Sequence, residues 1–141
     1  MELLAPQILR AGRELIDPIL LPCGFSWGYG ASGASSGGNF ASGCYSRDDR
    51  ALELHYRFSL GLVSYRMGEL CIDHAEYMSV VAQRGQSQYP GFSDDPLDGF
   101  RHLAHDLVAY CAAFLRGPDA EFARVVELVA AKPQGRRLPL P

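Results

Sequence analysis

Residues 51–73, ALELHYRFSLGLVSYRMGELCID, decide the fold, because apolar and polar residues alternate through most of this stretch. Alternation with a period of two is typical of a strand that has one dry face. Gly61 and Gly68 follow the first and second strand-like runs, and glycine suits tight turns. We therefore predict three antiparallel strands, joined by turns at Leu60-Gly61 and Gly68-Glu69.

The register of these strands follows from the positions of the two turns. With two residues at the centre of each turn, the large apolar side chains of all three strands fall on one face of the sheet. The polar side chains then fall on the other face, as is usual for an antiparallel sheet with one solvated side. The predicted facing pairs are Leu54 with Met67, Tyr56 with Tyr65, Phe58 with Val63, Met67 with Leu70, and Tyr65 with Ile72.

The composition indicates a globular protein. Of the 141 residues, 48% are hydrophobic, and a domain of this length buries roughly two thirds of its unfolded surface. We expect one domain over residues 1–131, followed by an extended or disordered tail over residues 132–141, which contains three prolines. The longest apolar run, near residues 18–22, is too short to cross a bilayer, and the N-terminus lacks the layout of a signal peptide. We therefore expect a cytoplasmic protein that does not bind membranes.

Charge and cysteine content narrow the classes of partner. The formal net charge is −3, and only Arg136 and Arg137 are adjacent basic residues, so we expect no nucleic-acid binding. The four cysteines form no C-x-x-C pair, which gives no sign of a zinc knuckle or a redox dithiol. We expect them to be reduced, and we expect no cofactor.

The flanking sequence predicts helices on both sides of the strands. Asp73 and Glu76 have the spacing of a capping box at the start of a helix. With these helices the chain is predicted to be a two-layer α+β domain, with a twisted antiparallel sheet of four or five strands and the N-terminal and C-terminal helices packed on one face. The predicted elements are a helix over residues 2–17 that Pro18 ends, strands over 25–29 and 40–45, and helices over 73–83, from Asp95-Pro96 to Gly117, and from Pro118-Asp119 to the tail.

The glycine-rich stretch 28–43 contains two well-known patterns. Residues 28–33 spell G-x-G-x-x-G and residues 33–37 spell G-x-S-x-G, but no helix follows either pattern and the chain is short for a hydrolase of the second type. We interpret part of the stretch as a hairpin loop. The alternative is an anion-binding nest of successive amides, formed by Ser35, Ser36, Gly37 and Gly38.

Three polar residues on the longest predicted helix are weak candidates for metal ligands. His102 and His105 lie one turn apart and Asp106 is next to them, so an ion could contact two imidazoles and a carboxylate. A third ligand position is not evident, and a solvated helix face explains the same residues. We therefore predict no metal site, and we assign no chemistry to His74 in the first turn of its helix.

The polar face of the predicted sheet carries the strongest candidates for binding. The predicted register places His55 opposite Arg66 and Arg57 opposite Ser64, with Glu53 diagonal to Arg66. Arginine offers planar, bidentate hydrogen bonding to a carboxylate, so this patch could recognise an acidic edge of a partner. The same alternation is also usual for a sheet face that only contacts water.

These observations favour a small non-enzymatic protein-binding domain of bacterial type. The partner would dock on the polar face or on the loop that carries Tyr89 and Phe92. In layout the predicted domain is similar to some small α+β immunity proteins that neutralise toxins, a similarity of architecture that no residue motif carries.

Two alternatives stay open. The first is a site for a small ligand, an anion or hydrolysis, located where the Ser35–Gly38 loop would approach His55 or His74. A histidine and a serine within hydrogen-bond reach in a pocket would favour it. The second is a homodimer formed through an exposed strand edge, which would appear as a dimer without any other partner.

Overall fold

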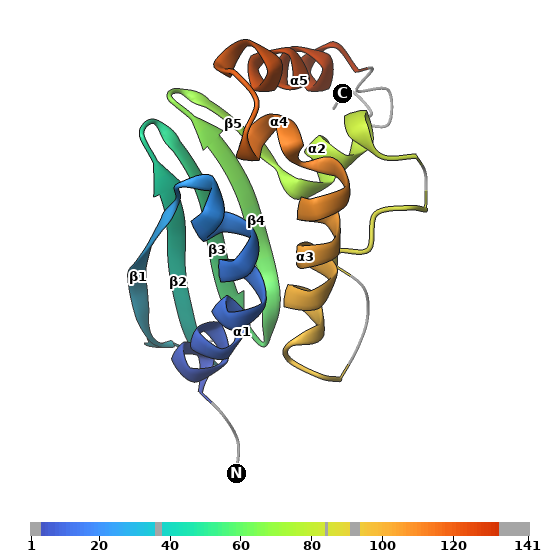
Figure 1. Cartoon of the computed structure of the whole chain (residues 1–141). Coiled ribbons are helices and arrows are strands. Elements are labelled where there is room, and N and C mark those ends of the chain that lie inside the picture. Colours follow the sequence, from blue (N-terminus) through green and yellow to red (C-terminus); the bar gives the residue numbers. More distant parts are fainter. Residues whose placement is uncertain (1–3, 36–37, 84, 91–93, 133–141) are drawn as a thin grey trace, which may run out of the picture.

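The chain folds into a five-stranded antiparallel sheet with helices packed on one of its faces (Figure 1). The computed structural model describes residues 4–35, 38–83, 85–90 and 94–132. The strands lie across the sheet in chain order, so each hairpin joins two neighbours, and the predicted α+β architecture is confirmed. The elements are α1 (Ala5–Leu20), a 3-10 turn (Leu21–Cys23), β1 (Ser26–Ser35), β2 (Gly38–Arg47), β3 (Arg50–Arg57), β4 (Ser59–Met67), β5 (Leu70–Asp73), α2 (His74–Val81), α3 (Asp98–Tyr110), α4 (Ala112–Leu115) and α5 (Asp119–Ala131).

The hairpin between β4 and β5 has the predicted register. Met67 faces Leu70 and Tyr65 faces Ile72. Gly68 opens the turn with a φ of +60°, which glycine adopts without steric cost. Tyr65 and Ile72 are both buried, so the prediction for this turn is confirmed.

The hairpin between β3 and β4 has a different register from the predicted one. Its tip is Phe58, which has a φ of +63° and is 76% exposed, so Phe58 does not face Val63. Instead, Val63 faces Leu54 and Tyr65 faces Leu52. The predicted turn at Leu60-Gly61 and the three facing pairs derived from it are therefore wrong.

In the observed register β3 is shifted along β4 by an even number of residues relative to the prediction. Because side chains alternate between the two faces, each side chain of β3 stays on the face predicted for it. Tyr56 and Tyr65 no longer face each other, yet both are buried on the side of the helices. A bulge next to Tyr56 accommodates the unpaired residue of β4. The reason for the shift is that pairing now extends to Arg50, which faces Met67, so Leu52 has a partner and is fully buried.

The glycine-rich stretch forms two long strands and not mainly a loop. β1 continues to Ser35 and β2 begins at Gly38, so the strands predicted over 25–29 and 40–45 are too short. Small side chains leave no apolar periodicity to reveal such strands. Gly43 is required here, since a Cβ at this position would lie 2.4 Å from the ring of Trp27.

The helix boundaries differ from the predicted ones in two places. α1 runs through Pro18 to Leu20, because Pro18 is exposed and water can take the place of the backbone hydrogen bond that proline cannot make. α3 begins at Asp98 and not at Pro96, since the Asp95 carboxylate accepts from the Leu97 amide before the helix starts.

The long helix predicted up to Gly117 is divided at Cys111. At this residue φ is −105° and ψ is +23°, which separates α3 from α4. The α2 capping box of Asp73 and Glu76 is confirmed, with hydrogen bonds of 2.7 and 3.0 Å between backbone amides and carboxylates. None of the helices in the described ranges combines the length and the apolar character that crossing a bilayer requires.

Aromatic side chains fill the space between the sheet and the helices. The ring of Phe100 from α3 stacks on Tyr56 of β3, with 6.2 Å between centroids. Gly12 lets α1 approach this ring closely, because a Cβ there would lie 2.4 Å from it. Further along the sheet, Phe114 and Tyr77 both pack edge-on against Tyr65.

Arg50 fastens the end of the sheet to the junction between α4 and α5. Its side chain is 5% exposed, and one guanidinium nitrogen donates to the carbonyl of Phe114 at 2.7 Å. The other donates to the Gly117 carbonyl at 2.7 Å and to Asp119 at 2.8 Å. A buried guanidinium with these partners supplies donors to a helix end that otherwise lacks them.

We expect the substitution Arg50→Met to lower the free energy of unfolding by about 2–5 kcal/mol, because buried carbonyls lose charge-assisted hydrogen bonds. Urea denaturation followed by circular dichroism measures this change. The matched control is Arg66→Met, which removes a half-exposed arginine with a single ion pair and is expected to cost less than about 1 kcal/mol. Equal losses in the two variants would contradict the role of Arg50.

Candidate functional site

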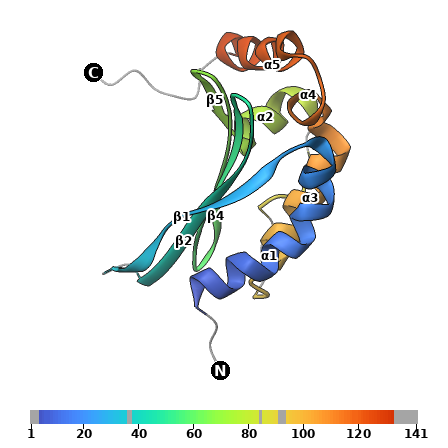
Figure 2. The ribbon, with the colours of Figure 1, turned by 60° about the vertical axis from the view of Figure 1, so that its left-hand side comes forward.

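Among the residues that the structure describes, no helix covers one of the two faces of the sheet (Figure 2). α1 and α3 lie against the other face (Figure 2), and alternate residues of β3 are buried beneath them. We call the side that points away from these helices the outer face. Its side chains on β3 and β4 include Glu53, His55, Arg57, Leu62, Ser64 and Arg66.

The outer face has a shallow hollow of about 390 Å³. β1 and β2 supply mainly glycine, serine and cysteine here, and the side chain of Tyr29 contacts Arg13 of α1, so little side chain fills the space between β1 and β3. A Cβ at Gly28 would meet nothing within 4 Å, while Leu62 is a large apolar residue left 50% exposed at the far side. The lining residues are Gly28, Tyr29, Gly30, Ser42, Gly43, Cys44, Glu53, Leu54, His55 and Leu62.

Two of the predicted binding residues form an ion pair on this face. Glu53 accepts from Arg66 at 3.4 Å and from the Ser64 hydroxyl at 3.2 Å. The predicted diagonal contact between Glu53 and Arg66 is thus confirmed. Their side chains are 40% and 46% exposed, so the pair contributes at most about 1 kcal/mol to stability and stays accessible to a ligand.

The other two predicted binding residues have different neighbours from those expected. The ring of Phe40 stacks on His55, with 5.7 Å between centroids, and the Arg57 guanidinium lies 5.2 Å from the centre of the same ring. The residues that face His55 and Arg57 on β4 differ from the predicted ones because the register of β3 and β4 differs from the predicted register. The predicted pairs of His55 with Arg66 and Arg57 with Ser64 are wrong, and the observed pairs are His55 with Leu62 and Arg57 with Ser59.

Cys44 lines the hollow as a neutral thiol. Burial raises its pKa, and the negative charge of Glu53, its facing residue on β3, raises it further. Because the thiolate is the nucleophilic form of cysteine, Cys44 acts here as a small apolar group.

Tyr89 does not belong to the outer face. Its hydroxyl donates to the carbonyl of Leu60, its ring contacts His74 edge-on, and burial raises the pKa of Tyr89 to about 12. The residue therefore anchors its segment to the helix side of the sheet. Its predicted neighbour in binding, Phe92, lies outside the described residues.

The predicted anion-binding loop is separated from His55. Ser35 and Gly38 pair with each other at the end of the β1–β2 hairpin, while Ser36 and Gly37 lie outside the described residues. His55 faces Ser42, which is four residues along β2 from Gly38, or roughly 13 Å at the usual rise of a strand. The arrangement does not place the backbone of the hairpin end beside this imidazole.

The predicted metal candidates do not converge. His102 lies at the surface, with Nδ1 donating to the carbonyl of Pro90 at 3.1 Å, whereas the Asp106 side chain is fully buried. A solvated position for Asp106 is therefore wrong. Within the part of the chain that the structure describes, no group of three or more histidine, cysteine or acidic residues could hold a metal ion.

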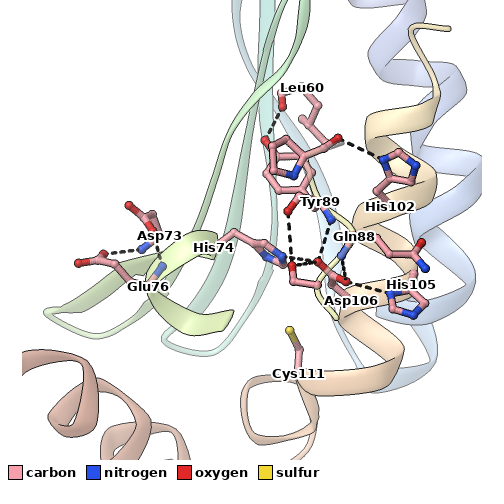
Figure 3. Close-up of polar contacts among 12 residues, drawn as sticks. Leu60, Asp73, His74, Glu76, Gln88, Tyr89, His102, His105, Asp106 and Cys111 are labelled. Carbon is pink, nitrogen blue, oxygen red and sulfur yellow. Dashed lines mark hydrogen bonds and ion pairs between the residues drawn. The ribbon is translucent and has the colours of Figure 1, made fainter. Parts of the chain in front are cut away.

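Asp106 is the centre of a buried hydrogen-bond network (Figure 3). Its carboxylate accepts from His74 Nε2 at 2.8 Å and from the Ser87 hydroxyl at 2.6 Å. It also accepts from the backbone amides of Gln88 and Tyr89 at 2.8 and 3.0 Å, and from His105 at 2.9 Å. One carboxylate thus joins α2, α3 and the segment that connects them.

Ionised Asp106 is strongly favoured by this arrangement. Burial alone would raise its pKa, but the hydrogen bonds from His74, Ser87, Gln88 and His105 outweigh burial and hold the pKa of Asp106 well below its usual range. Because a carboxylate can only accept, His74 carries a proton on Nε2. In the neutral ring Nδ1 then accepts from the Tyr65 hydroxyl, at 2.7 Å.

The network connects α2, α3 and residues 87–89, and its side chains are not arranged for catalysis. Both ring nitrogens of His74 are engaged, and its side chain is 2% exposed. Burial raises the pKa of Tyr65 well above its usual value and that of Cys111 to about 12, so neither side chain is an activated nucleophile. The geometry supports a polar core that positions residues 87–89.

Sequence reasoning misses this network because its members are far apart along the chain. His74 and Asp106 are 32 residues apart, and Ser87 is 19 residues from Asp106. The available signal was the position of Asp106 itself, which lies next to Leu107 and three residues after Leu103, two core residues of α3. That spacing places Asp106 at the border of the apolar stripe and not on the opposite face.

Comparison with protein-family models, with curated proteins and with solved structures finds no match.

We expect Asp106→Asn to lower the free energy of unfolding by about 2–4 kcal/mol near neutral pH, because an amide cannot accept from all five donors. The pKa of Asp106 is lower in the folded state than its ordinary value of 3.8. The stabilisation is therefore fully present above that value and is lost as pH falls below it.

Urea denaturation of both proteins across a pH series measures this effect. The difference between wild type and Asp106→Asn should narrow as the pH falls below about 4, since only the wild type titrates at this position. A difference that stays constant down to about pH 2 would contradict the inferred stabilisation of the ionised carboxylate.

Proposed function

We propose that this protein is a non-enzymatic binding module that holds another protein on the outer face of its sheet. The observation that carries the proposal is the uncovered face itself, because in the described part of the chain every helix that packs on the sheet lies on the other side (Figure 2). A solvated face is common for an antiparallel sheet, but on this face the half-exposed Leu62 borders a hollow that a side chain of a partner could enter.

The chemistry of the outer face resembles the anatomy of protein interfaces. Leu62 and the neutral Cys44 thiol supply apolar groups to the lining of the hollow, and the accessible Glu53–Arg66 pair supplies polar groups. Apolar groups in a hollow can pack against a large side chain of a partner, while charged groups give specificity more than affinity. The wide opening of the hollow suits a protruding side chain of a protein better than an enclosed small molecule.

Toxin neutralisation is the form of this function that we propose to test first. This choice follows the similarity of predicted architecture to some small α+β immunity proteins, and the outer face requires no catalytic group to hold a toxin. The hydrolytic alternative has less support, because the thiol in the hollow is neutral and the imidazole of His55 stacks on Phe40.

We expect Leu62→Asp to weaken binding of the partner by about 30-fold or more in Kd, the cost of losing about 2 kcal/mol at the centre of an interface. The partner is first captured from the host with the tagged wild-type chain and identified by mass spectrometry. Its affinity is then measured by isothermal titration calorimetry with the purified proteins. The matched control is Val108→Asp, which adds the same charge at an exposed valine of α3.

The control should bind like the wild type. Loss of binding in Val108→Asp with retained binding in Leu62→Asp would contradict the proposal and would place the binding site on the helical side of the molecule. Recovery of no specific protein by the wild type, together with a reproducible thermal stabilisation by a small molecule, would replace the proposal with the small-ligand alternative.

A further inference from the structure

The first strand of the sheet has an open edge. β1 pairs with β2 on one side, and in the described part of the chain no strand pairs with its other side. Residues 28–33 are all exposed, although Arg13 of α1 contacts Tyr29 on the side of the helices. Figure 2 shows β1 running along the margin of the sheet, with its end projecting away from the helices.

This edge lacks most of the features that keep strand edges from pairing. β1 is ten residues long and contains no charged residue and no proline. Natural edge strands are usually short, charged, interrupted by proline or covered. The opposite edge fits that rule, because β5 has only four residues, follows Glu69 in its turn and ends in Asp73 at the start of α2.

We infer that β1 pairs with β1 of a second copy of this chain, antiparallel and about a two-fold axis. An edge that meets an identical edge must avoid placing like charges together, and an uncharged strand does so. An edge that recognises a strand of a different protein would gain specificity from charged residues, which β1 lacks. Two arginines of α1 interact with Tyr29. Arg13 is paired with Asp17 at 3.3 Å, and Arg10 is exposed, where water and salt screen its charge.

The pairing is centred on Gly28. A bulge interrupts β1 between Tyr29 and Ser32, so its regular part near the hollow ends at Tyr29. With the axis at Gly28, Trp27 faces Tyr29 of the second copy, and Tyr29 faces Trp27 of the second copy. Aromatic cross-strand pairs of this kind stabilise sheets. Tyr29 is 54% exposed in one chain and would be less exposed in the dimer.

The dimer also widens the hollow on the outer face. Glu53, His55 and Leu62 form its wall on β3 and β4, but Gly28 and Gly30 leave the side of β1 without a wall. The second copy extends the floor of the hollow on this side with its own β1, whose outer-face residues near the axis are again serine and glycine. A contact between two β1 edges about a two-fold axis uses the same edge of both copies. The other edge of each sheet is β5, which is short and flanked by Glu69 and Asp73, so it does not pair further and the assembly closes as a dimer.

Light scattering coupled to size-exclusion chromatography of the full chain tests this inference. From about 1 μM to about 1 mM, the range that covers most moderate Kd values, we expect the mass to rise to twice the 15.4 kDa of one chain. Gly28→Lys places two ammonium groups across the axis and should stay monomeric. The space around Gly28 accepts this side chain, since a Cβ there meets nothing within 4 Å.

The matched control is Gly61→Lys, a second exposed strand glycine whose Cβ would make only ordinary contacts, the closest at 3.9 Å. It should dimerise like the wild type. A wild type that stays monomeric throughout the range, or a Gly28→Lys variant that still dimerises, would overturn the inference.

Hydrogen exchange of the wild type gives a readout that needs no variant. Amides of β1 should gain protection as the concentration rises, while those of β5 should not. Unchanged exchange in β1 at the highest concentration would also overturn the inference. The result does not depend on the proposed partner, because no other protein is present.

Discussion

The whole architecture depends on the alternation of apolar residues along β3 and β4. A strand with this pattern can bury only one of its faces, and in this protein the helices cover that face alone. β3 alternates strictly between buried and half-buried positions, and the aromatic residues of α3, α4 and α5 complete the layer above it. The uncovered face is the direct consequence, because its polar residues contribute nothing that a further helix could bury.

Two polar groups position the helical layer more exactly than apolar packing can. Arg50 supplies donors to the junction of α4 and α5, and Asp106 accepts donors from α2, α3 and residues 87–89. Apolar packing tolerates alternatives, whereas a buried charge is stable only when its partners are all in place. These two residues therefore select one arrangement among the packings that the core would allow.

The sequence predicts those features that local chemistry determines. Alternation predicts which side of the sheet Tyr56 and Tyr65 occupy, Gly68 predicts the second turn, and Asp73 with Glu76 predicts the start of α2. The first hairpin is mispredicted because Gly61 suggests a turn, while the tip is formed by Phe58 in a conformation that phenylalanine rarely adopts. Pairing of β3 up to Arg50 outweighs that local preference.

The remaining features depend on contacts that no short stretch of sequence contains. Glycine and serine in β1 give no apolar period, and Asp106 looks like a surface residue beside His102 and His105 until its distant donors are known. For the candidate site, the ion pair of Glu53 and Arg66 is predictable from strand geometry. The hollow beside it is not, because it arises from side chains that are missing on the two neighbouring strands.

The buried thiol of Cys111, at the break between α3 and α4, can report opening of the core in the native protein. Cys111 is fully buried and Cys71 is exposed on the last strand, so a thiol reagent reaches the first only when the core opens. The ratio of the two labelling rates would follow that opening in the native protein without any introduced probe.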